Sequence, residues 1–125
     1  MVLKTKNIDN IDFENLIKLF VTFDIKTTLK CDDYKKIIQF YDDNELVGFM
    51  NYVELSVIGQ KKLYIKSIHS INDNYLDIIV KKMIKTLINK YYYLFADTNN
   101  ELLTENIIKT LRENEFDGGE NILFR

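Results

Sequence analysis

A strand–helix–strand unit in the second half of the chain restricts the folds that this sequence can adopt. The strand-like run KLYIKSIHSI (62–71) leads almost directly into the amphipathic run YLDIIVKKMIKTLINK (75–90), and a second strand-like run, YYYLFAD (91–97), follows at once. The helical run places its apolar residues on one stripe, made of Leu76, Ile79, Val80, Met83, Ile84, Leu87 and Ile88. Strands joined by a helix usually lie parallel in one sheet. The sequence therefore predicts a parallel crossover.

The connection between the first strand and the helix of this unit contains no glycine. It reads Ser70, Ile71, Asn72, Asp73, Asn74. The N-terminus of a helix offers bare N–H groups to a phosphate, and close approach of a ligand there normally needs glycine. Asp73 is itself stabilising at this position, because its carboxylate meets the positive end of the helix dipole. We therefore expect the chain to satisfy internally the position that a phosphate-bearing ligand would fill.

The first half of the chain predicts a strand, a helix and an antiparallel meander. VLKTKNI (2–8) alternates as a strand, and Asp12 is placed to cap a helix, with Ile11 and Leu16 forming a hydrophobic staple. The apolar residues at helical spacing predict that this helix buries Phe13, Leu16, Ile17, Phe20 and Val21. A short second helix, capped by Asp32 or Asp33, is expected within 24–34.

Two turns then separate three antiparallel strands. KIIQFYDD and NELVGFMNYVELSV flank the turn at 42–45, and Gly59 marks the turn into 62–71. The run from Tyr91 to Ala96 is apolar enough to predict a strand that is buried on both faces. A last helix is expected from about Asn100 to Asn114, and the terminal strand ENILFR follows the glycine pair at 118–119.

The bulk properties indicate one soluble domain that spans residues 1–125. Hydrophobic residues make up 46% of the chain and charged residues 29%, which is ordinary for a globular protein. The net charge of -2 argues against nucleic-acid binding. No apolar stretch approaches the roughly 18 residues that suggest a membrane span. The single cysteine, Cys31, fits a reducing cytoplasm, and the absence of proline with abundant Lys, Asn and Ile suggests an AT-rich genome.

The order of predicted elements, β-α-(α)-β-β-β-α-β-α-β, resembles the fold of the GCN5-related N-acetyltransferase (GNAT) superfamily. NELVGF, with Gly48, is similar to the central hairpin of that family. The strand and helix at 62–90 resemble the family's acetyl-CoA-binding unit, and TNNELLTENIIKTLRENEF resembles its closing helix, which ends at a phenylalanine, here Phe116. The resemblance implies a single α/β (α+β) domain, with a mixed and mostly antiparallel sheet of about six strands and flanking helices.

The sequence departs from the family at the two places where function resides. In the family, a loop rich in glycine and in Arg or Gln binds the pyrophosphate of acetyl-CoA through its amides. The matching positions here offer Ile71, Asn72 and Asn74, and Lys81 on the following helix would be the cationic ligand if acetyl-CoA binds. The family's frequent general acid is a tyrosine, and the matching position here is Leu111, which cannot donate a proton.

Two residues are candidates for a catalytic base. His69, the only histidine, lies near the end of the strand 62–71, and its ordinary pKa suits proton transfer. Glu54 could activate an amine through a water molecule. The alternatives are a histidine without a special task and a solvated carboxylate. A metal site is not expected, because one histidine and one cysteine are a poor ligand set.

Three functional hypotheses follow. The first is a GNAT-like domain with a degenerate acetyl-CoA site that acts by binding a macromolecular partner, in particular a protein. The second is a divergent acetyl-CoA-dependent N-acetyltransferase, in which a substrate amine attacks the thioester directly. The third is a small inhibitory or structural protein of a mobile element. Tyrosines such as Tyr64 and those at 91–93 could lie at an interface, and the terminal strand could pair within the monomer or with another copy in a homodimer.

Overall fold

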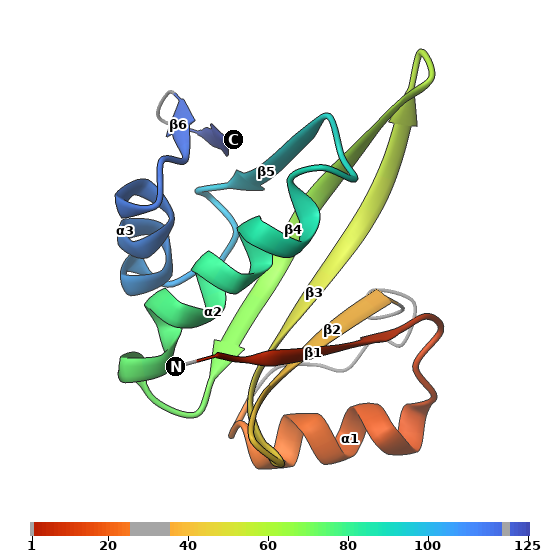
Figure 1. Cartoon of the computed structure of the whole chain (residues 1–125), viewed down its shortest axis with the longest axis vertical. Helices are drawn as coiled ribbons and strands as arrows, with labels where there is room; N and C mark the ends of the chain where they lie inside the picture. Colours follow the sequence, from red (N-terminus) through yellow and green to blue (C-terminus); the bar gives the residue numbers. More distant parts are fainter. Residues whose placement is uncertain (1, 26–35, 119–120) are drawn as a thin grey trace.

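The computed structural model describes residues 2–25, 36–118 and 121–125. The predicted second helix, with its caps Asp32 and Asp33, and Cys31 lie outside the described residues. The described elements follow one another as predicted, in the order β1, α1, β2, β3, β4, α2, β5, α3, β6 and β7 (Figure 1).

A seven-stranded sheet forms the centre of the domain. Its strands are ordered β1-β2-β3-β4-β5-β7-β6, and among the described residues only β4 and β5 pair in parallel. The predicted meander and parallel crossover are therefore confirmed. The strands are β1 (Lys4–Ile8), β2 (Lys36–Asp42), β3 (Glu45–Val57), β4 (Gln60–Ser70), β5 (Tyr93–Asp97), β6 (Asp117–Gly118) and β7 (Ile122–Phe124). The prediction of about six strands omitted the two-residue β6.

Within the described residues, three helices pack on this sheet: α1 (Phe13–Thr22), α2 (Asp73–Leu87) and α3 (Glu105–Glu113). Asp12 caps α1 as predicted, since its carboxylate accepts a hydrogen bond of 2.8 Å from the Asn15 amide. The last helix begins at Glu105 and not near Asn100, because the hydroxyl of Thr104 caps it by accepting from the Ile107 amide. In the described parts of the chain, no helix is long and apolar enough to cross a membrane.

The helices cover the two faces of the sheet unequally (Figure 1). α2 and α3 lie on one face and contribute to the main core cluster, which also draws on β2, β3, β4, β5 and β7. α1 lies on the other face and forms a small cluster with β2 and β3 through Leu16, Leu19, Phe20, Ile37 and Phe49. Among the described residues, this second cluster contains none from β5 or β7.

The buried face of α1 is narrower than predicted. Leu16, Leu19 and Phe20 are buried, whereas Phe13, Ile17 and Val21 are exposed. The prediction was wrong for these three, because α1 rests on a small part of the sheet and buries only a narrow stripe of residues at i, i+3 and i+4.

Gly48 allows α2 to pack closely on β3. A Cβ atom at this position would lie 2.4 Å from the Cδ1 atom of Ile79 and 2.7 Å from the carbonyl oxygen of His69. Neither distance is compatible with ordinary packing, so the glycine of the NELVGF segment is required by the contact between helix and sheet.

β5 is buried on one face only. Leu94 and Ala96 are fully buried, but Tyr93 is 37% exposed and Phe95 is half-buried. The prediction of burial on both faces was wrong, because α2 and α3 cover one face of β5 while the cluster beneath α1 does not reach the other. Apolar side chains of β5 therefore remain at the surface.

Candidate functional site

The junction between β4 and α2 is short and is closed by its own polar groups. β4 ends at Ser70 and α2 begins at Asp73, so Ile71 and Asn72 alone connect them. Asn72 caps the helix: its side-chain oxygen accepts a hydrogen bond of 3.0 Å from the Asn74 amide. Its carbonyl oxygen accepts another, of 3.3 Å, from the Tyr75 amide. Two amides at the helix N-terminus are therefore already engaged.

Two side chains of the first turn of α2 extend to neighbouring elements. The Asp73 carboxylate accepts a hydrogen bond of 3.3 Å from the amide group of Asn106, in the first turn of α3. The Tyr75 hydroxyl donates to the Asp42 carboxylate at 2.9 Å, and this hydrogen bond is the main cause that raises the pKa of Tyr75. The positive end of the helix dipole thus faces a carboxylate of its own chain.

β4 and β5 separate beyond their paired segment. Their parallel pairing runs to the pair Ile65 and Ala96, whereas β4 continues to Ser70. A register shift against β3 leaves Lys66 between two paired residues of β4. The side-chain amide of Asn100 donates to the Lys66 carbonyl at 2.6 Å. Asn100 thus links β4 to the segment that follows β5, at the place where the two strands diverge.

His69 lies on the α1 side of the sheet and is shielded from solvent. Its ring stacks on Phe49, with ring centroids 4.6 Å apart and an angle of 29° between the ring planes. Its Nε2 atom is buried and has no hydrogen-bond partner among the described residues. Burial lowers the pKa of His69 from 6.5 to about 4, so the imidazole is neutral near pH 7. A neutral imidazole can accept a proton, but this nitrogen lies out of contact with solvent.

Glu54 lies on the opposite face of the sheet, in a polar cluster near the C-terminal end of α2. Its carboxylate accepts a hydrogen bond of 2.5 Å from the Tyr91 hydroxyl and pairs with Lys36 at 3.2 Å. The hydrogen bond from Tyr91 is the main cause that lowers the pKa of Glu54. Burial alone would lower the pKa of Lys36, but the hydrogen bond and charge of Glu54 outweigh burial and raise it. The pair therefore stays ionised at neutral pH.

The structure does not bring the two candidate bases together. In the sheet, Glu54 is opposite Leu63 and Phe49 is opposite His69. Leu63 and His69 are six positions apart on β4, which corresponds to about 20 Å along the strand. Because the side chains also project from opposite faces, His69 and Glu54 cannot serve one reacting centre.

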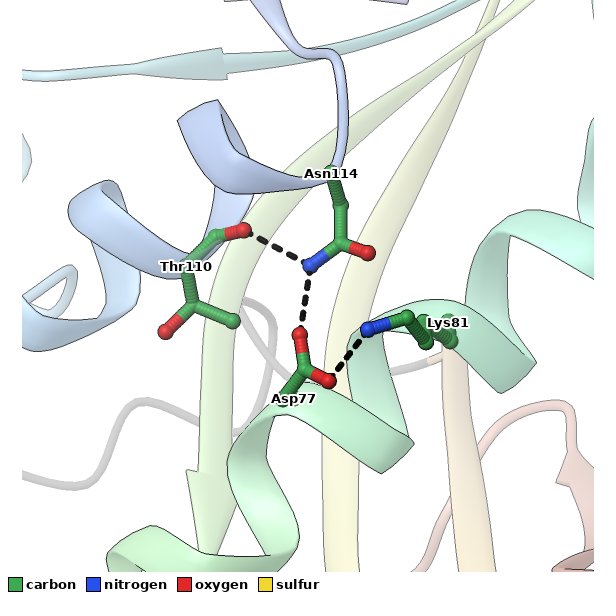
Figure 2. A network of polar contacts seen from close by, with 4 residues as sticks. All are labelled: Asp77, Lys81, Thr110 and Asn114. Atoms are coloured by element: carbon green, nitrogen blue, oxygen red, sulfur yellow. Dashed lines mark hydrogen bonds and ion pairs between the residues drawn. The ribbon is translucent and has the colours of Figure 1, made fainter.

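Lys81 lies away from the β4–α2 junction. It is eight positions beyond Asp73, or about 12 Å along the helix. Its ammonium pairs with the Asp77 carboxylate, which also accepts a hydrogen bond of 2.9 Å from Asn114 (Figure 2). The same Asn114 amide donates to the Thr110 carbonyl, so this network joins α2 to the end of α3. The residues predicted for cofactor binding thus divide: Ile71, Asn72 and Asn74 lie at the junction, and Lys81 does not.

The position that matches the family's general acid belongs to the core. Leu111 is fully inaccessible to solvent and packs within the main core cluster, which also includes Phe116. Leu111 can contribute to packing but not to proton transfer. In the described part of the chain, no group of His, Cys, Asp and Glu residues is arranged to hold a metal ion.

A row of apolar side chains faces solvent on the α1 side of β4, β5 and β7. The residues of these strands that belong to the main core are Leu63, Leu94, Ala96 and Leu123. The residues that alternate with them along each strand project to the opposite face, away from the main core. They line a shallow groove of about 320 Å³ or lie beside it. We call this surface the aromatic platform, made of Lys62, Tyr64, Tyr93, Phe95, Ile122 and Phe124.

The side chains of the aromatic platform contact one another without being buried. The rings of Tyr64 and Phe95 are 5.0 Å apart between centroids, and those of Tyr93 and Phe124 are 5.7 Å apart. Ile122 is 51% exposed and Phe124 is 44% exposed. Sequence reasoning identified tyrosines as interface candidates but missed this surface. The sequence offers no clear signal for it, because successive residues of YLFA and ILF are apolar and do not distinguish a buried face from an exposed one.

The arrangement of the sheet, the parallel β4–α2–β5 unit and the position of Gly48 together define the GNAT fold. Comparison with known proteins supports this assignment through structure alone. No family model matches the sequence, and no curated protein sequence matches it. Solved structures do match over nearly the whole chain, and many of them are N-acetyltransferases.

Three of these structures illustrate the similarity. An N-acetyltransferase from Staphylococcus aureus Mu50 has a TM-score of 0.68 at 16% identity, covering 99% of this chain and 97% of its own. YhhK from E. coli, a putative N-acetyltransferase bound to coenzyme A, has a TM-score of 0.69 at 11% identity, covering 100% and 98%. Naa50 from Arabidopsis thaliana, in complex with a bisubstrate analogue, has a TM-score of 0.65 at 13% identity, covering 100% and 99%. At such identities the similarity establishes the fold and no more.

Proposed function

We propose that this GNAT-fold domain acts by binding a protein partner through the aromatic platform, and that the β4–α2 junction does not hold the pyrophosphate of acetyl-CoA. The observation that carries the proposal is the state of the α2 N-terminus. A connection of two residues, a side-chain cap from Asn72 and the carboxylate of Asp73 occupy the place where a phosphate would bind.

Binding a pyrophosphate at this junction would be costly. The ligand would have to displace the Asn72 cap, a contact worth about 1 kcal/mol in typical helices. It would also bring negative charge close to the Asp73 carboxylate. The Lys81 ammonium does not offset this repulsion, because it is paired with Asp77. A binding loop of bare amides gains energy from the charge of the ligand. At this junction two amides are already engaged, one by the Asn72 side chain and one by the Asn72 carbonyl oxygen.

The aromatic platform has the composition of a binding surface. Contiguous apolar surface is uncommon on monomeric proteins and often marks a site of interaction. Tyrosine and phenylalanine are enriched at the centres of protein interfaces, where their large rings bury area at a low entropic cost. The exposed rings of Tyr93 and Phe124 supply this chemistry.

The first half of the proposal is tested with radiolabelled acetyl-CoA. The purified protein is passed through a desalting column after incubation with the ligand, and acetyl transfer to a panel of amines and peptide N-termini is measured in parallel. We expect neither stoichiometric retention of the label nor enzymatic transfer. Stoichiometric retention of the label, or enzymatic transfer of the acetyl group, would contradict the proposal that the acetyl-CoA site is degenerate.

The second half is tested by affinity capture from an extract of the source cells. The variant Phe124→Ala removes a ring of the platform, and Phe13→Ala removes a comparably exposed ring from α1. We expect captured protein to be lost with Phe124→Ala and retained with Phe13→Ala. Equal capture by both variants would exclude the platform as the partner-binding surface.

A divergent acetyltransferase is the second candidate function, favoured by the divergence of β4 and β5 beyond Ile65 and Ala96. In this alternative the pantetheine arm lies between the diverging strands and a substrate amine attacks the thioester directly. His69 or Glu54, but not both, accepts the proton through water. Loss of turnover in His69→Ala or in Glu54→Gln would identify that base, and unchanged turnover in both would remove both from the mechanism.

A further inference from the structure

We propose that the occupant of the aromatic platform is an acidic protein segment that inserts one large apolar side chain into the groove of the platform. This inference rests on the proposed function and names the chemistry of the partner. The anchor side chain would be aromatic or aliphatic, and its neighbours in the segment would be Asp or Glu. The groove and the charges around it carry the two halves of the inference.

The groove has the size and the lining for a single anchor. Its volume is about 320 Å³, and it is bounded by the rings of Tyr93, Phe95 and Phe124 and by the aliphatic chain of Ile122. An anchor placed there would meet ring faces and edges on two strands, β5 and β7. Such a pocket is the usual form of an interface hot spot, in which a central apolar side chain supplies most of the binding energy.

The charge beside the groove is positive and available. The Lys62 ammonium lies over the Tyr93 ring, 5.8 Å from its centroid, and makes no ion pair with a described residue. Lys61 precedes Lys62 on β4 and projects to the opposite face, where Lys61 and Lys90 line the polar cavity beside Glu54. Among the described residues, Lys62 is the cation that lines the groove.

Glu54 cannot neutralise Lys62, because the two side chains lie on opposite faces of the sheet. The two oxygens of Glu54 are engaged by Tyr91 and Lys36, which lie on the other face together with the polar cavity that Lys61 and Lys90 line. A partner that supplies a carboxylate next to its anchor would therefore complement Lys62. Complementary charge of this kind raises the association rate and fixes the orientation of the partner.

The β3–β4 hairpin projects beyond the rest of the sheet (Figure 1), and it carries further exposed apolar residues. Leu55 is opposite Lys62 in the sheet and is 40% exposed. At the tip, Ile58 is 95% exposed and has a φ of 53°, a left-handed conformation that is costly for a β-branched residue. An exposed and strained apolar residue at the tip of a hairpin indicates a contact with another molecule.

A single-stranded nucleic acid would also present charge and rings, but it fits this surface less well. Asp97 continues the alternation of Tyr93 and Phe95 at the far end of the platform. The pKa of Tyr64 is raised mainly by burial and further by the negative charge of Asp97. The charge of Asp97 is therefore felt on the platform face. A long polyanion that follows the rings would meet Asp97, whereas a short acidic segment at the lysine end would not.

The test uses the full chain and three defined polymers: a random copolymer of glutamate and tyrosine, polyglutamate, and poly(U) RNA. Binding is measured by fluorescence anisotropy at fixed ionic strength. The variants are Lys62→Glu and Phe124→Ala, with Lys18→Glu as the matched charge control, because Lys18 is exposed on α1. We expect saturable binding of the glutamate–tyrosine copolymer, weakened about tenfold or more by each platform variant and unchanged in the control.

Four results would overturn the inference. Equal binding of polyglutamate would mean that only charge is recognised, and tighter binding of poly(U) would indicate a nucleic-acid surface. Insensitivity to Lys62→Glu would remove the acidic component. Self-association of the chain that Phe124→Ala abolishes, observed by sedimentation, would make a second copy the occupant. If the copolymer fails to bind while Phe124→Ala still abolishes capture of a cellular partner, the proposed function stands and the partner chemistry alone is wrong.

Discussion

The N-terminus of α2 and the aromatic platform differ in how far their groups are already occupied by contacts within the chain. At the α2 N-terminus, the side chain and carbonyl of Asn72 bind two amides, and Asp73 and Tyr75 bind residues of α3 and β2. On the platform, Tyr93, Ile122 and Phe124 remain exposed. The first region was expected to be closed by its own groups, and it is. The second was expected to be buried and is open. A binding site is therefore better sought where the fold leaves polar groups without partners or apolar side chains exposed.

Adjacent residues of β5 offer the strongest test of this comparison. Leu94 is fully buried, and its neighbour Tyr93 projects onto the platform. We expect Leu94→Ala to lower the free energy of unfolding by about 3 kcal/mol, because it leaves a cavity in the core. We expect Tyr93→Ala to cost less than about 1 kcal/mol, because its ring packs only at the surface. Urea unfolding measures both, and equal losses would contradict the assignment of faces.

Acidification is expected to destabilise the protein through His69. Its pKa is lowered to about 4 in the folded state, below the ordinary value of 6.5, so the unfolded chain binds the proton more readily between these values. Stability contributed by the neutral imidazole is complete above about pH 6.5 and is lost as the pH falls toward 4, by at most about 3 kcal/mol.

Thermal unfolding of wild type and His69→Phe across pH 4–7 isolates this contribution. The phenyl ring keeps the stacking on Phe49 without titrating. The difference in stability between the two proteins should shift in favour of the variant as the pH falls. A difference that stays constant with pH would show that His69 is not buried as a neutral group.

Removal of the helix cap should have a moderate effect. Asn72→Ala deletes the acceptor for the Asn74 amide and is expected to cost about 1 kcal/mol of unfolding free energy. Asn74→Ala is the matched control, since the cap uses the Asn74 backbone and not its side chain. A cost for Asn72→Ala no greater than that of the control would mean that the α2 N-terminus is not closed by Asn72.

The smallest expected change is a gain in stability at the β3–β4 hairpin. Ile58 and Gly59 both have positive φ, of 53° and 74°, and Asn-Gly is the preferred pair for such a turn. Ile58→Asn should therefore stabilise the protein by roughly 1 kcal/mol while weakening binding of the glutamate–tyrosine copolymer. If the variant is neither more stable nor weaker in binding, Ile58 neither strains the hairpin nor contacts the partner.

Local patterns in the sequence were sufficient to predict the order of the helices and strands. The Asp12 cap, the three-stranded meander and the parallel crossover each depend on residues that are close in sequence, and the structure confirms them. The absence of glycine between Ser70 and Asp73 likewise anticipated a junction that is closed by its own side chains.

The faces of the elements could not be predicted in the same way. Whether Tyr93 and Phe95 are buried depends on whether a distant helix covers β5, and the sequence of β5 contains no information on that. The same is true of Phe13 and Val21 on α1, which are apolar but lie outside the narrow stripe that contacts the sheet. The separation of His69 from Glu54 also needed the register of β3 against β4.

The most direct test of the central claim is a calorimetric titration of the full chain with acetyl-CoA, with thermal unfolding as a cross-check. A ligand that binds only the folded state stabilises it by about 2.7 kcal/mol at a hundred times its dissociation constant, so specific binding would be visible in both measurements. We predict no saturable heat and no shift of the unfolding transition. Saturable one-to-one binding, with a matching rise in the unfolding temperature, would show that the capped α2 N-terminus still admits the cofactor and would contradict this account.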